Sequence, residues 1–221
     1  MTVLPPVQSK PSPWQVTIGA EGIAAAQFAR CGFDVSVQSG PNKPWYDLVV
    51  AKAGNLLKVS VKGSDDGSWA LADPFLKRTA DLKGKQANYK GAIDMWLDHH
   101  GSRAVCCLVQ FQSVSIGELP RIYLASPREI AQKLRDAADR LGSPTLYERY
   151  RWAPELDGPE SMVELPEDWF FSEGRVEELL AVQGSGSELR PLPQRTVVPV
   201  PTWPASAILP RVQQAVPALS A

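Results

Sequence analysis

The segment from Tyr46 to Ser64, which reads YDLVVAKAGNLLKVSVKGS, constrains the fold more than any other part of the chain. Two runs rich in valine and leucine flank a Gly-Asn pair, a pattern that is typical of two antiparallel strands joined by a tight turn. Residues two apart in a strand share a face. The second strand therefore has an apolar face and a polar face, whose members are Leu57, Val59 and Val61 on one side and Lys58, Ser60 and Lys62 on the other.

An acidic residue and a lysine meet at the end of this hairpin that lies far from the turn. Asp47 opens the first strand, and Lys62 lies near the end of the second. Because the turn is short, we expect both side chains at one edge of a sheet. A carboxylate can bind a hard cation such as Mg²⁺, and a lysine can stabilise the negative charge that develops on a phosphate under attack.

The remaining elements predict an α/β protein. Helices are expected over residues 17–30, 82–99 and 126–142, and three further strands over FDVSVQ, RAVCCLVQFQ and RIYLA. The third helix has the clearest start, with Ser126 as N-cap and Glu129 three residues later. The order α-β-β-β-α-β-β-α predicts a mixed sheet flanked by helices, followed by an irregular C-terminal cap and a Pro-rich tail.

Composition divides the chain into four segments. Residues 1–13 hold four prolines and are expected to be a disordered lead-in, and residues 14–142 form the predicted domain. Residues 143–183 are rich in aromatic side chains and are expected to pack on that domain. Residues 184–221 begin with a Gly/Ser hinge and hold seven of the 20 prolines, so a disordered tail is predicted there.

The sequence predicts a cytoplasmic protein without a membrane segment. No stretch approaches the roughly 18 to 20 apolar residues of a membrane helix, and the first residues lack the layout of a signal peptide. Three cysteines are too few and too poorly spaced for a disulfide framework or a zinc site. Cys106 and Cys107, inside the run AVCCLVQF, are expected to be core residues.

Charge is unevenly distributed along the chain. Residues 1–151 hold 19 Lys and Arg against 14 Asp and Glu, a net charge of +5, whereas residues 152–221 have a net charge of −6. A basic body is compatible with a polyanionic partner such as a nucleic acid, and it is equally compatible with ordinary surface composition.

With Glu21 in the first predicted helix, the hairpin residues resemble the PD-(D/E)XK nuclease superfamily, in particular its small resolvase-like and homing-endonuclease-like members. The likeness covers about residues 15–126. It implies a restriction-endonuclease-like fold that hydrolyses DNA with Mg²⁺ or Mn²⁺. It also implies that Glu21, Asp47 and the backbone carbonyl of Val61 bind the metal, and that Lys62 assists catalysis.

Ser60 departs from the pattern of this superfamily, because it stands where the second acid of the (D/E)XK motif would be. Tyr46 likewise replaces the usual proline before the aspartate. A hydroxyl is a much weaker metal ligand than a carboxylate, although Glu21 could fill the vacated position or Ser60 could bind through water. The alternative is a catalytically inactive module of the same fold that binds a nucleic acid or a protein partner.

A lysine-rich segment, LKRTADLKGKQANYK, predicts a strip that binds nucleic acid, and DNA is favoured over RNA as the partner. A solvated helix face remains the alternative, and a homodimer remains open. The residues of the strip are Lys77, Arg78, Lys83, Lys85, Gln86 and Tyr89.

Simpler structural roles remain open for each candidate. Asp47 alone could cap a loop, Lys62 could be a solvated strand-end lysine, and Glu21 could favour the start of a helix. His99 and His100 fall at the predicted end of a helix, where polar side chains are common, and a metal-binding or catalytic role is their minor alternative.

Overall fold

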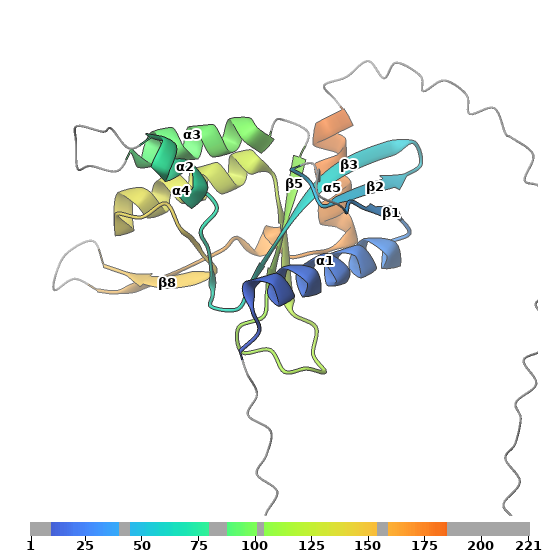
Figure 1. Cartoon of the computed structure of the whole chain (residues 1–221), viewed down its shortest axis with the longest axis horizontal. Coiled ribbons are helices and arrows are strands. Elements are labelled where there is room, and N and C mark those ends of the chain that lie inside the picture. The colour runs from blue at the N-terminus through green and yellow to red at the C-terminus, as the bar shows by residue number, and fades with distance from the viewer. Residues whose placement is uncertain (1–9, 40–44, 80–87, 101–103, 154–158, 185–221) are drawn as a thin grey trace, which may run out of the picture. The chain divides into compact units, whose positions relative to one another are not determined.

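A five-stranded mixed sheet forms the centre of the protein (Figure 1). The computed structural model describes residues 10–39, 45–79, 88–100, 104–153 and 159–184, with backbone alone at 77–79 and 183–184. The strand order is β1-β2-β3-β5-β6, and only the β3–β5 pair is parallel. The strands are β1 (Asp34–Val37), β2 (Leu48–Lys52), β3 (Asn55–Ser64), β5 (Ala104–Gln110) and β6 (Arg121–Ala125). The predicted α/β class, a mixed sheet flanked by helices, is confirmed.

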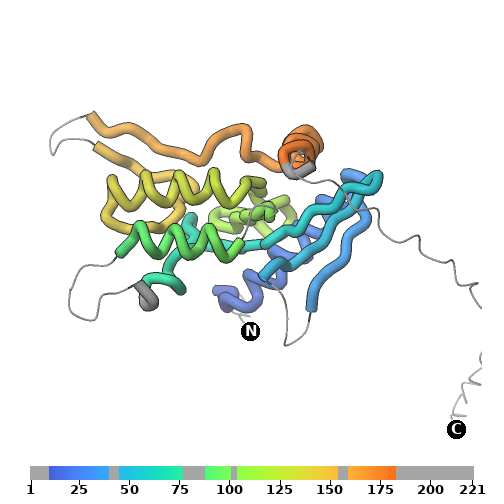
Figure 2. The backbone as a smooth tube through the Cα atoms, turned by 90° about the horizontal axis from the view of Figure 1, so that it is seen from above, coloured from blue at the N-terminus to red at the C-terminus, as the bar shows by residue number. Residues whose placement is uncertain are grey.

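The predicted β2–β3 hairpin is confirmed, with its turn one residue earlier than expected. Lys52 pairs with Asn55, so Ala53 and Gly54 are the two turn residues and Asn55 already belongs to β3. Both turn residues have positive φ, 52° and 82°. A two-residue loop of this kind requires φ > 0 at both positions to match the twist of the strands. Figures 1 and 2 show this turn at the end of the sheet away from α3 and α4.

The first helix, α1 (Pro13–Arg30), begins four residues before the predicted start. The reason is a capping box in which Ser12 accepts from the backbone of Gln15, while the Gln15 side chain accepts from the backbone of Ser12. Proline at the first helical position adds to this start. The predicted Pro-rich lead-in therefore ends where α1 begins, at Pro13. Residues 1–9 of that lead-in lie outside the described part.

Three other helices lie along the opposite face of the sheet, where α3 and α4 run side by side (Figure 2). They are α2 (Asp73–Thr79), α3 (Tyr89–His100) and α4 (Pro127–Leu141). The capping box of Ser126 and Glu129 and the left-handed Gly142 confirm the predicted limits of α4. The helix predicted over residues 82–99 is described from Tyr89, and its earlier part lies outside the described residues.

Two apolar clusters, one on each face, hold these layers together. The predicted apolar face of β3, which consists of Leu57, Val59 and Val61, packs in the cluster beneath α1. Cys106 belongs to the cluster beneath α3 and α4, and Cys107 to the other. Both cysteines are core residues, as expected.

The chain after α4 is more regular than expected. It contains β7 (Leu146–Tyr147), β8 (Arg149–Trp152), β9 (Ser161–Glu164), a 3-10 turn (Glu167–Trp169) and α5 (Glu173–Gly184). β7 pairs with β4 (Ser68–Trp69), and this pairing joins residues far apart in the sequence. Val176 of α5 packs in the cluster beneath α1. The predicted tail lies outside the described residues, and no described helix combines the length and the hydropathy needed to cross a membrane.

Gly63 sets how closely α1 approaches β3. A Cβ atom at this position would lie 2.8 Å from the carbonyl oxygen of Val16 and 2.9 Å from the Ala20 Cβ. Because one of these atoms belongs to a helix backbone, the clash cannot be relieved by a side-chain rotation. Only glycine therefore allows the observed contact between the helix and the strand.

We expect Gly63→Ala to lower the free energy of unfolding by about 1–3 kcal/mol, the usual cost of overpacking a core. The control is Gly22→Ala, because Gly22 lies in α1 with no atom within 4 Å of an added Cβ. That change should be neutral or stabilise the protein by up to about 1 kcal/mol, since alanine favours helix. Equal effects in urea denaturation would contradict the close approach.

Candidate active site

A cleft of about 660 Å³ opens at the edge of the sheet where β2 ends. The last pair of the β2–β3 ladder is Leu48 with Val59, whereas β3 continues to Ser64 along β5. In the described part of the chain, β3 beyond Val59 therefore has a partner strand on one side only. The open side of β3 is the floor of the cleft.

Asp47 ends the ladder with both its backbone and its side chain. Its N–H donates to the carbonyl oxygen of Val59 at 2.8 Å, and its carboxylate Oδ2 accepts from the N–H of Val61 at 2.6 Å. The residue is 7% exposed. The carboxylate thus replaces the next rung of the sheet, and this bond fixes its position at the cleft.

Lys62 lies one residue further along β3 and lines the same cleft. Its side chain is half-buried on the face that carries α3 and α4, since its partner Leu108 belongs to the cluster beneath those helices. The indole N–H of Trp69 donates to the carbonyl oxygen of Lys62 at 3.1 Å. This bond ties the backbone of Lys62 to the segment that follows β3.

The charges of Asp47 and Lys62 act on the buried thiol of Cys106. Burial raises the pKa of Cys106 to about 12, while the charge of Lys62 lowers it and that of Asp47 raises it. Both charges are thus close enough to this part of the sheet to act on Cys106.

Glu21 reaches the cleft from the other layer. It lies on α1, whose buried face packs against the opposite side of β3, and together with Thr17 it lines the cleft at the sheet edge. The structure thus brings the side chains of Glu21, Asp47 and Lys62 and the residue Val61 to one cleft. They come from a helix, a loop and a strand.

Ser60 is placed differently from these four residues. It is fully buried beside Cys106 and does not line the cleft. Its hydroxyl is the one buried side-chain oxygen or nitrogen of the described residues that has no hydrogen-bond partner. A buried polar group without a partner costs about 1–3 kcal/mol of stability. Ser60 is therefore a local weakness of the fold.

We expect Ser60→Ala to raise the free energy of unfolding by about 1 kcal/mol, because it removes an unpartnered hydroxyl. Ser64 offers a matched control on the same face of β3, since its hydroxyl bonds Asp66, Ser68 and Gln110. Ser64→Ala should lower stability by about 1–3 kcal/mol. Chemical denaturation of the two variants compares them directly, and a loss of stability in Ser60→Ala would show that the hydroxyl has a partner.

The aromatic part of the cleft lining was not predicted from the sequence. It consists of aromatic side chains and two histidines, which we call the aromatic wall: Trp45, Trp69, Phe75, Trp96, His99 and His100. The only local signal is the position of Trp45, two residues before Asp47. The other members come from β4, α2 and α3, and their approach depends on tertiary packing.

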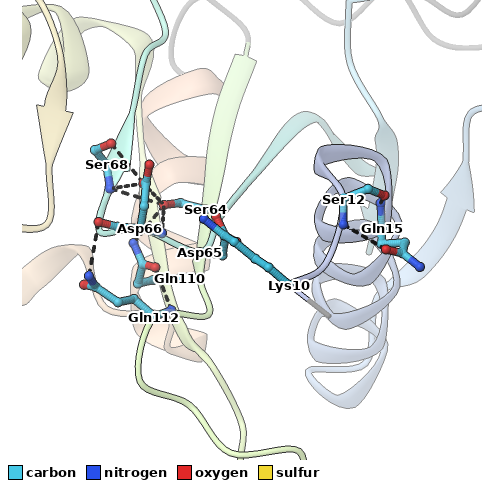
Figure 3. Close-up of polar contacts among 9 residues, drawn as sticks. All are labelled: Lys10, Ser12, Gln15, Ser64, Asp65, Asp66, Ser68, Gln110 and Gln112. Atoms are coloured by element: carbon cyan, nitrogen blue, oxygen red, sulfur yellow. Dashed lines mark hydrogen bonds and ion pairs between the residues drawn. The ribbon is translucent and has the colours of Figure 1, made fainter. Parts of the chain in front are cut away.

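A network of polar bonds holds the turn that carries Trp69 (Figure 3). Asp66 accepts from the backbone and the hydroxyl of Ser68 at 3.0 Å, and from the hydroxyl of Ser64 at 3.0 Å. Burial acts to raise the pKa of Asp66, but these hydrogen bonds outweigh it and keep the pKa below its usual value. Gln110 of β5 donates to Ser64 at 3.1 Å, so the turn is anchored to the sheet.

The predicted nucleic-acid-binding strip lies largely outside the described residues, since Lys83, Lys85 and Gln86 fall there. Lys77 and Arg78 belong to α2, but their side chains are not described. Tyr89 is half-buried at the start of α3 and does not line the cleft. The strip therefore stays a prediction.

The donor atoms at the cleft suit a divalent cation that keeps much of its water. Glu21 and Asp47 supply carboxylates, and Val61 supplies a carbonyl on the side of β3 where the ladder has ended. Among the described residues, no three His, Cys, Asp or Glu side chains are grouped to hold a metal. Mg²⁺ is commonly bound through one or two carboxylates plus waters, so the donors fit such a site and not an all-protein cage.

Substitution of Asp47 should separate its structural role from its charge. Asp47→Ala leaves the Val61 N–H without an acceptor and should lower the free energy of unfolding by about 1–3 kcal/mol. Asp47→Asn retains an oxygen for that bond and should lose less. Denaturation in metal-free buffer measures both, and equal losses would contradict the structural role of the Asp47–Val61 bond.

The chain was compared with protein families, curated proteins and solved structures. No family model and no curated protein matches it. Among solved structures, it is similar to a bacterial homing endonuclease, I-Ssp6803I, with a TM-score of 0.40 and 16% sequence identity, over 80% of this chain and 98% of that chain. A likeness of this size does not assign the chain to a family, and membership in the PD-(D/E)XK superfamily stays a prediction.

Proposed function

We propose that the protein is a metal-dependent nuclease that hydrolyses phosphodiester bonds of DNA. The observation that carries this proposal is the meeting of Glu21, Asp47, Val61 and Lys62 at one cleft, at the open edge of β3. Residues of these types, in this order along the chain, are those in which the sequence resembles the PD-(D/E)XK nucleases.

The metal in this proposal is Mg²⁺ or Mn²⁺. Glu21, Asp47 and the carbonyl of Val61 would hold it, and most of its remaining ligands would be water. When bound, the ion supplies charge stabilisation at the phosphate and lowers the pKa of a bound water. The Asp47–Val61 hydrogen bond keeps one carboxylate oxygen occupied, so the position of the other oxygen is set by the sheet itself.

Lys62 and the aromatic wall act on the substrate in this proposal. The ammonium group of Lys62 stabilises the negative charge that develops on the phosphate oxygens, a role in which a preorganised donor is effective. Trp69 fixes the backbone of Lys62, which limits the region that its side chain can reach. The rings of Trp45 and Phe75, which are partly exposed, offer flat surfaces for a sugar or a base.

Cleavage assays with matched lysine variants test the proposal. The full chain is incubated with supercoiled, linear and single-stranded DNA and with RNA, in Mg²⁺ or Mn²⁺ and with a chelator as blank. We expect cleavage that Lys62→Ala reduces by about 100- to 1,000-fold, the usual effect of losing one stabilising donor. Lys58→Ala is the control, since Lys58 shares the strand and the face of Lys62 but lies over the ring of Tyr46, 5.1 Å from its centre.

Cleavage at the same rate in wild type and Lys62→Ala would point to a contaminating nuclease and would contradict the proposal. Loss of activity in Lys58→Ala as well would show that the effect is a general loss of charge on β3. The substrate panel also decides between DNA and RNA.

A second function, a module of the same fold that binds nucleic acid without cutting it, is favoured by Ser60. The acid of the motif is missing there, and the hydroxyl is buried away from the cleft. This function predicts DNA binding that weakens steeply with salt, without turnover in any metal. Ser60→Glu is its probe, because a gain in Mg²⁺ affinity in this variant would mark the cleft as a vestigial metal site.

A further inference from the structure

His100, the last residue of α3, has its tautomer fixed by the fold. Its Nδ1 lies 2.8 Å from the carbonyl oxygen of Trp96, one helical turn earlier. A carbonyl oxygen only accepts hydrogen bonds, so Nδ1 carries the hydrogen. In the neutral imidazole, Nε2 is then left with a lone pair and acts as an acceptor.

The free lone pair of His100 faces the cleft. The residue is 6% exposed and lines the cleft with Asp47 and Lys62. Its Nε2 makes no hydrogen bond to a described residue, and it is not among the buried side-chain atoms that lack a partner. Because Nδ1 is bonded to the helix backbone, Nε2 is the ring nitrogen left for the cleft that His100 lines.

Three rings hold the imidazole in this orientation. The ring centre of Trp96 lies 4.5 Å away, that of His99 lies 5.6 Å away, and that of Trp45 lies 5.7 Å away. With Nδ1 bonded to the helix backbone, the ring has little freedom to turn over. A side chain fixed in this way is positioned before a substrate arrives.

The surroundings of His100 favour its neutral form. Burial is the largest cause and lowers its pKa below the usual value, and the charges of Lys62 and His99 act in the same direction. The hydrogen bond to Trp96 and the charge of Asp47 act in the opposite direction without reversing the shift. These groups come from β3, from α3 and from the segment before β2, so they represent each element that faces the ring.

We propose that His100 is a catalytic residue whose Nε2 takes the proton from the water that attacks the phosphorus, a role that rests on the proposed nuclease function. The water oxygen forms a bond to phosphorus as its proton passes to Nε2. The bond from phosphorus to the leaving oxygen breaks, and that oxygen keeps the electron pair and is protonated by solvent. Ser60 cannot take this proton, because it is fully buried and does not line the cleft.

The first test compares His100→Asn with Asp98→Asn in the full chain. Asparagine at position 100 retains a donor for the Trp96 carbonyl but has no acceptor at the place of Nε2. We expect kcat to fall by about 100- to 10,000-fold, the range for loss of a general base, with KM little changed. Asp98→Asn is the control, because Asp98 lies two residues earlier in α3, is exposed and does not line the cleft; this variant should keep most of the activity.

The second test needs no variant and is therefore independent of how well His100→Asn folds. Nitrogen-15 NMR of the wild-type imidazoles should show His100 as the Nδ1–H tautomer at neutral pH. Because protonation of Nε2 removes the acceptor, kcat should be lost as the pH falls through the midpoint at which His100 titrates. Activity should persist to a lower pH than an ordinary histidine with pKa about 6.5 would allow.

The outcomes separate this inference from the nuclease proposal. Cleavage that depends on Lys62 but is unchanged in His100→Asn would overturn the role of His100 and leave the nuclease function standing. An Nε2–H tautomer, or an acid limb that does not follow the His100 titration, would overturn it as well. No metal-dependent cleavage in the wild type would overturn both proposals.

Discussion

The hydrogen bond from the Val61 N–H to the Asp47 carboxylate is the interaction on which the cleft depends. A strand edge presents unpaired N–H and C=O groups, which a protein has to cover or pair. Here the β2–β3 ladder stops at the pair of Leu48 and Val59, while β3 continues. The Asp47 carboxylate takes the place of the next hydrogen bond of the ladder. Asp47 thereby ends the ladder, and the same hydrogen bond holds its carboxylate at the cleft. The structural role of Asp47 and its proposed functional role therefore depend on one bond.

Two buried polar residues near this opening, Ser60 and His100, differ in their hydrogen bonds. Ser60 lies in the core, and its hydroxyl has no hydrogen-bond partner. A carboxylate at that point would need an opposite charge or hydrogen bonds to be stable in such a place. His100 is also buried, and burial lowers its pKa and favours its neutral form, while a bond to the helix backbone orients the ring. Of these two buried polar side chains, only that of His100 is oriented by a hydrogen bond to the backbone.

The sequence predicted those parts of the fold that depend on local pattern. Alternation along β3 assigned its two faces correctly, and the Ser126–Glu129 pair located the start of α4, because strand and capping geometry act over a few residues. The same reasoning underestimated α1, since the capping box of Ser12 and Gln15 lies inside a Pro-rich stretch that reads as disorder. Asp47 and Lys62 were expected at one edge of the sheet because a single hairpin carries both, and the structure places them at one cleft.

The members of the aromatic wall could not be predicted from local sequence pattern. Trp69 lies on a two-residue strand whose partner, β7, is almost 80 residues further along the chain, and no periodicity marks such a pair. Trp96 and His100 have helical spacing, which by itself predicts a buried helix face. Their role in the cleft depends on where α3 ends relative to β3, and only the packed structure gives that position.

Gly63 connects the packing of the layers to the chemistry at the cleft. It follows Lys62 directly, and its missing side chain lets the backbone of Val16 come within contact of β3. That approach brings the first turns of α1, with Thr17 and Glu21, to the edge of the sheet. If α1 were held further away by a side chain, Glu21 would move from the cleft while Asp47 and Lys62 stayed, because their positions are set within the sheet. The second carboxylate of the candidate site is thus placed by a close helix–strand contact, and the first by a hydrogen bond.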